Sequence, residues 1–304
     1  MIEENQQIIS KNHLVAIVIL SHNKKKDILE CLDSIFNLDY NEFEVIVVDN
    51  GSSDGSVEEI KTKYPNVHLI ESKINLGVAG GRNLGVKCAN EILKYKFLLF
   101  LDDDIVIDKS ALSEMISSFN SDGNIGIVTP KCYLTNMPRV IGYAGGMSVN
   151  LFIGKITDIG GGVIDVGQLD QSKFISSSAG LCLLRKELFN KVGMFDEKFN
   201  PYGWEDVDFS LRTRQKGFKI FYNHKAVVFH KGGKKGRGKA IAEYEFSKSK
   251  NYFYLIRKHA NIFQLLILSM VLPVRALLII TKELLRGEFK TISAQFRGIL
   301  SLIK

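Results

Sequence analysis

Three short apolar segments in the first third of the chain each lead directly into a polar cluster, and this pattern limits the possible folds more than any other feature. The apolar runs are residues 14–20 (LVAIVIL), 43–48 (FEVIVV) and 97–101 (FLLFL). Continuous apolar runs of this length are typical of strands buried on both faces of a parallel sheet. The clusters that follow them are Ser21-His22-Asn23, Asp49-Asn50-Gly51-Ser52-Ser53-Asp54 and Asp102-Asp103-Asp104.

Helical segments are expected between these strands. Residues 25–36 have apolar side chains at helical spacing, a second helix is expected to begin at Asp54, and residues 77–93 form a third after a short strand at 67–70. The alternation predicts an α/β fold with a Rossmann-like, doubly wound, mostly parallel sheet. Ligands of such sheets bind beyond the carboxyl ends of the strands, so the three polar clusters are expected to meet at one edge.

The rest of the chain divides into a glycine-rich middle and a helical end. Residues 139–180 are rich in glycine and predict short strands and loops. Helices are expected near 187–192 and 205–216, and two short strands at 219–222 and 226–229. From Ala242 onward the pattern is helical. We therefore predict two domains, residues 1–240 and a helical appendage of residues 241–304.

The aspartate triplet at 102–104 indicates a metal site. Three adjacent carboxylates repel one another, and a divalent cation removes this repulsion. Oxygen ligands select a hard ion such as Mg²⁺ or Mn²⁺, and Mg²⁺ is usually shared between one or two carboxylates and substrate phosphates. The structural alternative is a solvated acidic turn or a helix cap.

Two other clusters are candidates for holding a nucleotide. Asp49 ends a strand at the expected cleft, where its carboxylate can accept a hydrogen bond from a base or a ribose hydroxyl; the alternative is a turn. The segment 75–85 (NLGVAGGRNLG) opens a helix. Its helix N-terminus and Arg82 favour a diphosphate, although the spacing differs from a dinucleotide fingerprint.

Two motifs in the second half carry candidate catalytic groups. The string at 204–208 (WEDVD) begins a helix, and a carboxylate there either caps the helix or serves as a general base toward an attacking hydroxyl. His230 ends an apolar strand, so it is a candidate metal ligand, with a structural histidine as the alternative. The basic loop after it, 231–239, is expected to close over phosphates when a donor binds; the alternative is a solvated loop.

These motifs, in this order, resemble glycosyltransferase family 2, whose members are inverting enzymes with a GT-A fold. The resemblance covers about residues 14–235. It rests on the strings VVDNGSSDGS, NLGVAGGRNLGV, LLFLDDDIVI, SSAGLCLLRKELFNKVGMFDEKFNPYGWEDVDFSLRTRQKGF and VVFHKGG. The second and fourth strings are most similar to rhamnosyltransferase-like and galactofuranosyltransferase-like members.

The resemblance implies a role for each motif residue. Asp206 would be the catalytic base, and the metal would be held by Asp104 with Asp102 and His230. Because a third acid, Asp103, lies inside the motif, it stays open whether Asp102 or Asp103 assists Asp104. The implied donor-binding residues are Ser21, Asn23, Asp49, Asn75, Gly81, Arg82, Asp102 and Asp103. The implied acceptor side is lined by Gly180, Trp204 and Glu205.

The implied activity is a metal-dependent transfer, with Mg²⁺ or Mn²⁺, of a sugar from a UDP- or dTDP-sugar to a glycan or lipid-linked acceptor hydroxyl in cell-surface polysaccharide assembly. A sugar-nucleotide nucleotidyltransferase is the enzymatic rival. Such enzymes usually place a glycine-rich loop after the first strand, where this chain has residues 21–26 without glycine. A catalytically inactive membrane-associated scaffold is the second rival, and the presence of Asp104, Asp206 and His230 argues against it.

Positive charge and apolar side chains gather at the C-terminal end. Of the net charge of +7, residues 231–304 contribute +11 (15 Lys and Arg, 4 Glu), which leaves −4 for the first 230. Residues 262–280 are apolar around most of a helix, although Pro273 and Arg275 interrupt them. An amphipathic stripe follows at Phe289, Ile292, Phe296, Ile299, Leu300 and Ile303. The pattern predicts helices lying on or partly in the inner leaflet of the cytoplasmic membrane, with a membrane span or a helical homodimer interface as alternatives.

The expected location is therefore the cytoplasm, with peripheral or monotopic attachment to the membrane and no nucleic-acid partner. Residues 1–12 have no basic segment leading into an apolar run, so no signal peptide is predicted. The four cysteines fit neither a zinc site nor a disulfide framework and are expected to be small core residues in a reducing compartment.

Overall fold

The parallel half of the central sheet is built from the apolar runs of the N-terminal region. The computed structural model describes residues 14–232, 239–285 and 289–300. Strand β1 (Val15–Ser21) lies parallel to β2 (Phe43–Asp49) and to β4 (Phe97–Asp102), and β3 (His68–Glu71) extends this half beyond β2. The register pairs Ser21 with Asp49 and Leu20 with Asp102. The carboxyl ends of these strands therefore meet, as the sequence predicts.

The other half of the sheet is mixed. Strand β12 (Cys182–Arg185) is antiparallel to both of its neighbours, β4 and β6 (Ile125–Leu134), and β13 (Lys219–His230) runs parallel to β6. The two short strands expected at 219–222 and 226–229 are one strand, β13, whose register shifts between Asn223 and Val227. The ten-stranded sheet is completed by β5 (Ile105–Ile107), β7 (Met137–Ala144) and β10 (Lys173–Ile175).

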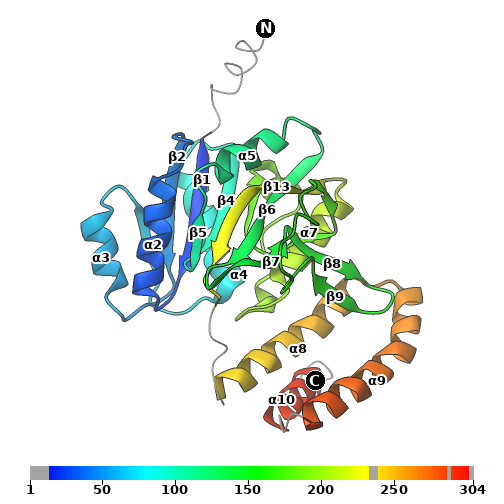
Figure 1. Ribbon diagram of the computed structural model, residues 1–304. Coiled ribbons are helices and arrows are strands. Elements are labelled where there is room, and N and C mark those ends of the chain that lie inside the picture. The colour runs from blue at the N-terminus through cyan, green and yellow to red at the C-terminus, as the bar shows by residue number, and fades with distance from the viewer. Residues whose placement is uncertain (1–13, 233–238, 286–288, 301–304) are drawn as a thin grey trace.

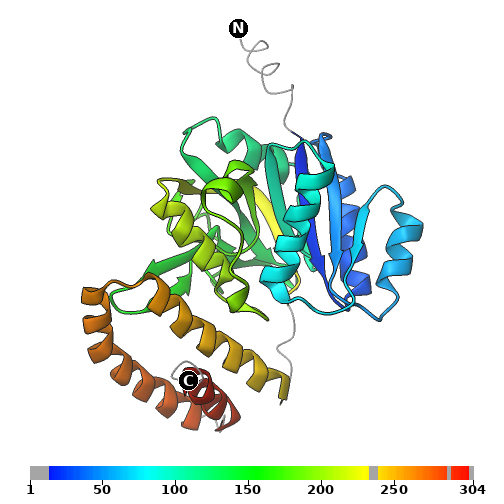
Figure 2. The ribbon, with the colours of Figure 1, turned by 180° about the vertical axis from the view of Figure 1, so that it is seen from behind.

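Helices cover both faces of this sheet (Figures 1 and 2). Alternate side chains of β1 point to opposite faces, so Ile17 and Ile19 belong to one core while Ala16 and Val18 belong to the other. The first core is covered by α2 (Lys25–Phe36), α3 (Ser56–Lys63) and α5 (Ala111–Ser118). The second is covered by α4 (Gly77–Ile92), α6 (Glu187–Lys191) and α7 (Glu205–Gln215). The four cysteines are free, and Cys31, Cys132 and Cys182 are buried.

Helix α3 begins two residues later than the sequence predicts. Gly55, in the left-handed conformation with φ 78°, precedes the first helical residue, Ser56. The Asp54 carboxylate accepts hydrogen bonds from the backbone N–H of Ser56 and from that of Lys25. Asp54 therefore ties the loop after β2 to the start of α2.

The glycine-rich middle of the chain contains short strands, as predicted, and three of them form a small second sheet. Its strands are β8 (Gly146–Asn150), β9 (Lys155–Asp158) and β11 (Ser177–Ser178). A short 3₁₀ helix, η1 (Glu197–Phe199), precedes α7. The β8–β9 hairpin points toward the C-terminal helices (Figure 1).

Three helices form the C-terminal part: α8 (Lys239–His259), α9 (Ile262–Leu285) and α10 (Phe289–Leu300). They lie below the carboxyl ends of the parallel strands in Figure 1, with α10 beside α8. Ser249 of α8 donates a hydrogen bond to the carbonyl of Gln295 in α10. Within the described ranges, no helix combines the length and the hydropathy needed to cross a bilayer.

Candidate active site

A cleft of about 540 Å³ opens where the strands β1, β2 and β4 end. It is closed on the opposite side by the start of α7 and by one face of α8. Its lining residues are Leu20, Ser21, His22, Lys24, Asn50, Asn75, Gly77, Val78, Arg82, Asp102, Asp103, Asp104, Ala179, Pro201, Tyr202, Glu205, Asp206, His230, Tyr244 and Lys248. Ligands of doubly wound sheets bind in this position.

The aspartate triplet forms the acidic wall of the cleft. Lys24 donates to both Asp103 and Asp104, with Nζ–O distances of 3.0 and 2.9 Å, and His230 Nε2 lies 3.3 Å from the other oxygen of Asp104. Burial raises the pKa of Asp103 to about 6, although Lys24 opposes this shift. Burial also opposes ionisation of Asp104, but the hydrogen bonds from His230 and Lys24 hold its pKa well below the usual range. The hydrogen bond to Asp104 raises the pKa of His230.

The donor set at this wall suits a hard divalent cation. Asp104 and His230 lie side by side, the partly exposed ammonium of Lys24 lies between Asp103 and Asp104, and the half-exposed Asp102 side chain faces the cleft. Among the described residues, no group of three or more His, Cys, Asp or Glu side chains is placed to hold a metal ion. A site with few protein ligands fits the common arrangement in which substrate phosphates complete the coordination.

Arg82 connects the triplet to the helix that carries the predicted base. Its Nη2 lies 3.3 Å from Asp102 Oδ1, and its Nη1 lies 3.3 Å from Glu205 Oε1. The guanidinium also packs 5.7 Å from the ring centroids of Phe100 and Phe195. Arg82 was predicted to bind a diphosphate, whereas in this structure its guanidinium forms ion pairs with the carboxylates of Asp102 and Glu205.

Asp206 faces the same cleft from the first turn of α7. Burial and the neighbouring charge of Glu205 raise its pKa to about 7, while Arg82 and the N–H of Val207 lower it. Glu205 is itself held by Arg82 and by the backbone N–H of Gly203. A carboxylate with a pKa near 7 has the proton affinity that a general base needs at neutral pH.

Several predicted site residues do not line the cleft. Asn23 instead braces the neighbouring loop, because its backbone N–H donates to the hydroxyl of Ser52 and its side-chain oxygen Oδ1 accepts from the backbone N–H of Ser53. The buried Asp49 accepts a hydrogen bond from the N–H of Ser52, so it closes the turn after β2. Its neighbour Asn50 lines the cleft in its place.

The two predicted glycines act through packing. A Cβ at Gly81 would lie 2.3 Å from a methyl carbon of Leu20, so this glycine permits close approach of α4 to β1. Gly180 has φ 85°, and a Cβ there would lie 2.9 Å from Arg82 Nη2. Trp204 lies outside the cleft, and its indole donates to the Lys248 carbonyl. Ser21 and Asn75 line the cleft as predicted.

Helix α8 supplies residues that the sequence did not indicate. Tyr244 and Lys248 line the cleft, although they follow the β-sheet region in sequence. Burial alone would lower the pKa of Lys248, but its hydrogen bond with Tyr244 and the charges of Asp206 and Asp158 raise it overall. Their spacing of four residues indicates that Tyr244 and Lys248 lie on the same face of a helix. Nothing in the sequence of α8 indicates that this face packs toward α7 and the cleft.

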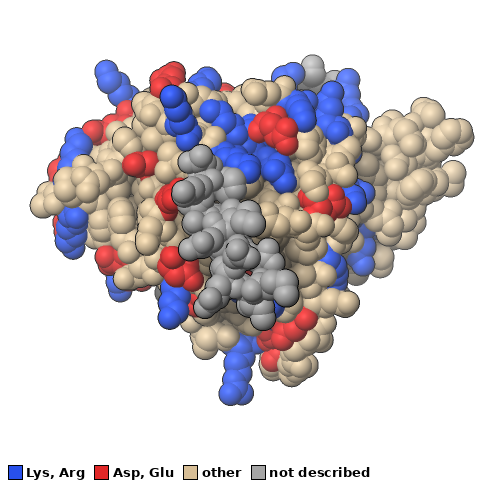
Figure 3. Space-filling view, turned by 90° about the horizontal axis from the view of Figure 1, so that it is seen from above, with Lys and Arg blue, Asp and Glu red and all other residues tan. Residues whose placement is uncertain are grey.

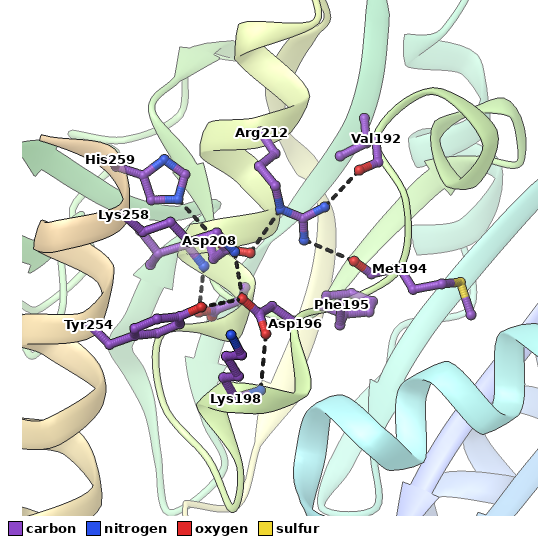
Figure 4. A network of polar contacts seen from close by, with 12 residues as sticks. Val192, Met194, Phe195, Asp196, Lys198, Asp208, Arg212, Tyr254, Lys258 and His259 are labelled. Atoms are coloured by element: carbon purple, nitrogen blue, oxygen red, sulfur yellow. Dashed lines mark hydrogen bonds and ion pairs between the residues drawn. The ribbon is translucent and has the colours of Figure 1, made fainter. Parts of the chain in front are cut away.

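A buried polar network fixes α7 against α8 (Figure 4). Asp208, two residues after Asp206, accepts hydrogen bonds from Arg212 Nε, Lys258 Nζ and His259 Nε2 at 2.8 to 2.9 Å. Arg212 in turn donates to the backbone carbonyls of residues 192 and 194. The network holds the first turn of α7 in place, and with it the position of Asp206.

Part of the predicted basic loop lies outside the described residues, including Lys234, Lys235 and Arg237. Lys231 is described, and its ammonium pairs with Asp27 and Glu30 of α2. Closure of this loop over phosphates stays a prediction.

The fold is the GT-A fold of solved glycosyltransferase structures. Residues 16–155, a little under half of the chain, match the family model described as Glycosyl transferase family 2. The resemblance to the family and the GT-A fold predicted from the sequence are confirmed. The rhamnosyltransferase-like or galactofuranosyltransferase-like subtype stays a prediction.

Curated relatives include two staphylococcal proteins named poly-beta-1,6-N-acetyl-D-glucosamine synthase. The protein from Staphylococcus epidermidis is 26% identical over 228 residues, which cover 74% of this chain and 51% of the relative. The protein from Staphylococcus aureus strain COL is 25% identical over 217 residues, which cover 71% and 49%. The chain thus spans about half the length of the curated relatives it matches.

Two solved structures share the fold. A crystal structure of GalNAc-T7 with UDP, GalNAc and Mn²⁺ superimposes with a TM-score of 0.65 at 16% identity, covering 84% of this chain and 49% of that chain. The crystal structure of S. aureus TarS superimposes with a TM-score of 0.55 at 19% identity, covering 85% and 42%. At these identities the likeness concerns the fold alone.

Proposed function

We propose that the protein is an inverting glycosyltransferase that moves a sugar from a UDP- or dTDP-sugar to an acceptor hydroxyl during cell-surface polysaccharide assembly. The observation that carries the proposal is the pairing of two carboxylate sites in one cleft. The triplet 102–104 forms one wall, and Asp206, whose pKa is raised to about 7, faces the cleft from another element. One site suits the diphosphate end of a donor, and the other suits an acceptor hydroxyl.

In the proposed reaction, Asp206 accepts the proton of the acceptor hydroxyl while the hydroxyl oxygen attacks the anomeric carbon. The bond between that carbon and the diphosphate oxygen breaks on the face opposite the attack, and the nucleoside diphosphate leaves with the electron pair of that bond. An α-linked donor therefore gives a β-linked product. General-base assistance of this kind contributes about 10²- to 10⁴-fold to the rate.

Asp104 and His230, whose side chains lie 3.3 Å apart, would hold Mg²⁺ or Mn²⁺ at the diphosphate end of the cleft, with Asp102 lining the same wall. A divalent cation there supplies positive charge that offsets the charge developing on the leaving diphosphate. The solved GalNAc-T7 structure, which contains UDP and Mn²⁺, supports this assignment by analogy of fold. Ser21, Asn50 and Asn75, which line the same cleft, would bind the nucleotide.

Attachment of the protein to the inner leaflet of the cytoplasmic membrane is part of the proposal. The outer face of α9 exposes a run of large apolar side chains: Ile262, Phe263, Leu265, Leu266, Met270, Val274, Leu277, Leu278 and Leu285. In Figure 3 the part of the molecule that projects at the right is tan, so no charged side chain is visible on it. It lies on the side where α9 begins in Figure 1. Exposed apolar surface of this extent marks interaction sites, including membrane contacts.

The deciding experiment is a panel of nucleotide sugars incubated with the protein and Mn²⁺, read by release of nucleoside diphosphate. We expect one UDP- or dTDP-sugar to be turned over and its nucleoside diphosphate to raise the melting temperature. Failure of every donor to give turnover or a thermal shift would overturn the proposal. Release of pyrophosphate from a nucleoside triphosphate and a sugar phosphate would instead indicate a nucleotidyltransferase.

A further inference from the structure

A second pocket, of about 600 Å³, lies between α8, α9 and α10 next to the β8–β9 hairpin. Its walls include Ile156, Tyr252, Phe253, Leu272, Pro273 and Phe296. Pockets that hold small molecules have volumes of about 300 to 1,000 Å³ and are lined mainly by apolar and aromatic side chains. This pocket has the size and the lining of a binding site, and the proposed transfer chemistry does not use it.

Lys248 joins this pocket to the catalytic cleft, because its side chain lines both. The ammonium lies 5.2 Å from the ring centroid of Trp204 and 5.1 Å from that of Tyr244. The indole of Trp204 donates to the Lys248 carbonyl at 2.9 Å. A cation is thus fixed at the boundary between an apolar pocket and the cleft that contains Asp206.

The outer wall of the pocket is held by an arginine inside an apolar helix. Arg275 of α9 donates to the backbone carbonyl of Ile153 at 2.7 Å and to that of Gly154. Tyr252 of α8 donates to the same Gly154 carbonyl at 2.6 Å. These bonds pin the hairpin tip, where Phe152 is exposed, beside the exposed apolar face of α9. The pocket therefore adjoins the surface that we propose to contact the membrane.

We infer that this pocket binds the hydrocarbon chain of a lipid acceptor whose phosphate-bearing head lies at Lys248, so that the hydroxyl to be glycosylated reaches Asp206. The inference rests on the proposed transferase function and names the class of its acceptor. An apolar lining suits a hydrocarbon chain and not a free glycan. The ammonium of Lys248 complements the charge of a phosphate. Because Lys248 lines both the apolar pocket and the catalytic cleft, a lipid whose hydrocarbon chain fills the pocket can extend its reacting hydroxyl into the cleft.

Trp204, which lines the pocket, is the one tryptophan of the chain, so its fluorescence reports directly on occupancy. The test is a titration of the full-length protein with dodecyl phosphate below its micelle concentration, with no donor present. We expect a saturable change in Trp204 emission. Ala276→Phe, which fills the pocket, should weaken binding at least about tenfold. Val274→Phe, on the exposed face of the same helix, should leave binding within about twofold of wild type.

A further arm tests the head group. Lys248→Gln should weaken the binding of dodecyl phosphate, because the phosphate loses its pairing with the ammonium. The same substitution should leave the binding of dodecanol unchanged, because the alcohol has no charge to pair. Circular dichroism checks that each variant is folded, and Ala276→Leu provides a smaller filling of the pocket if the phenylalanine disrupts it.

If Ala276→Phe and Val274→Phe weaken the binding of dodecyl phosphate equally, the probe binds to the outer face of α9 and the inference is wrong. The absence of a saturable signal would also overturn the inference. A change of oligomeric state in Ala276→Phe, measured by analytical ultracentrifugation, would instead assign the pocket to a second copy of the chain. These measurements need no donor. If no donor is turned over but the Trp204 emission still changes saturably, the transferase proposal would be wrong and the lipid-binding pocket would remain supported.

Discussion

Arg82 and Glu205, which are 123 residues apart in the sequence, form an ion pair with 3.3 Å between Nη1 and Oε1, and both side chains are almost completely buried. The pair links α4, whose first two turns line the cleft, to α7, which carries Asp206. Because Arg82 also contacts Asp102, one guanidinium sets the distance between the two acidic sites.

Arg82→Met should destabilise the fold. The substitution leaves the buried carboxylate of Glu205 without its cation, which typically costs about 3–5 kcal/mol. Urea unfolding followed by circular dichroism measures the loss. Lys87→Met, an exposed position on the same helix, is the matched control and should have little effect. Equal stability of the two variants would contradict a structural role for the Arg82–Glu205 pair.

Asp206→Asn should abolish transfer while leaving the affinity for donor nucleotide nearly unchanged. The amide cannot accept a proton, so kcat should fall about 10²- to 10⁴-fold. Nucleotide binding is measured separately, by calorimetry with the nucleoside diphosphate that the panel identifies. If the variant loses nucleotide binding as well, Asp206 has a role in the nucleotide or metal site and is not the base.

The pH dependence of transfer should report on Asp206. A base is active when deprotonated, so kcat should rise as the pH increases through about 7, the raised pKa of this carboxyl. Glu205→Gln removes the like charge that contributes to the shift, and the rising limb should therefore move to lower pH. A rising limb that is identical in the two proteins would show that a different group titrates.

The network around Asp208 should make stability depend on pH in the acid range. Burial opposes ionisation, but the hydrogen bonds from His259 and Lys258 and the charge of Arg212 lower the pKa of this carboxyl overall. A lowered folded pKa contributes stability that is complete above the unfolded value of about 4 and is lost as the pH falls through the folded value.

Asp208→Asn should accordingly cost about 3–5 kcal/mol at pH 7, because it removes the buried negative charge that Arg212, Lys258 and His259 share, and the deficit should shrink below about pH 4. Urea unfolding of both proteins from pH 7 to pH 3 measures this convergence. Asp122→Asn, which breaks an exposed pair with Lys219, is the control and should have a much smaller effect. A deficit for Asp208→Asn that does not change with pH would mean that the carboxylate charge is not its source.

The convergence of the strand ends was predictable because it follows from local pattern. A continuous apolar run is stable only when both faces of the strand are covered, and parallel neighbours then end at the same edge. The observed register, with Ser21 opposite Asp49, agrees with that reasoning. That Asp102, Asp104 and His230 line the cleft was likewise expected, because each lies at or just after the end of an apolar strand.

The roles of Asp49 and Arg82 were not predictable in the same way. Both were assigned to the donor from residue type and position, yet one closes a turn and the other joins two carboxylates. Which partner a charged side chain finds depends on elements that the chain contributes much later. Glu205 and Lys248 line the cleft only because α7 and α8 pack beside the ends of the parallel strands.

The sequence by itself determined the α/β class, the order of the elements and the edge at which the polar clusters meet, because apolar periodicity acts over a few residues. Only the tertiary structure decided that Arg82 pairs with Glu205, that Lys248 lines both the cleft and the apolar pocket, and that Asp206 lies where its pKa rises. Those properties depend on burial and on charges brought together from distant segments, and no local pattern encodes them.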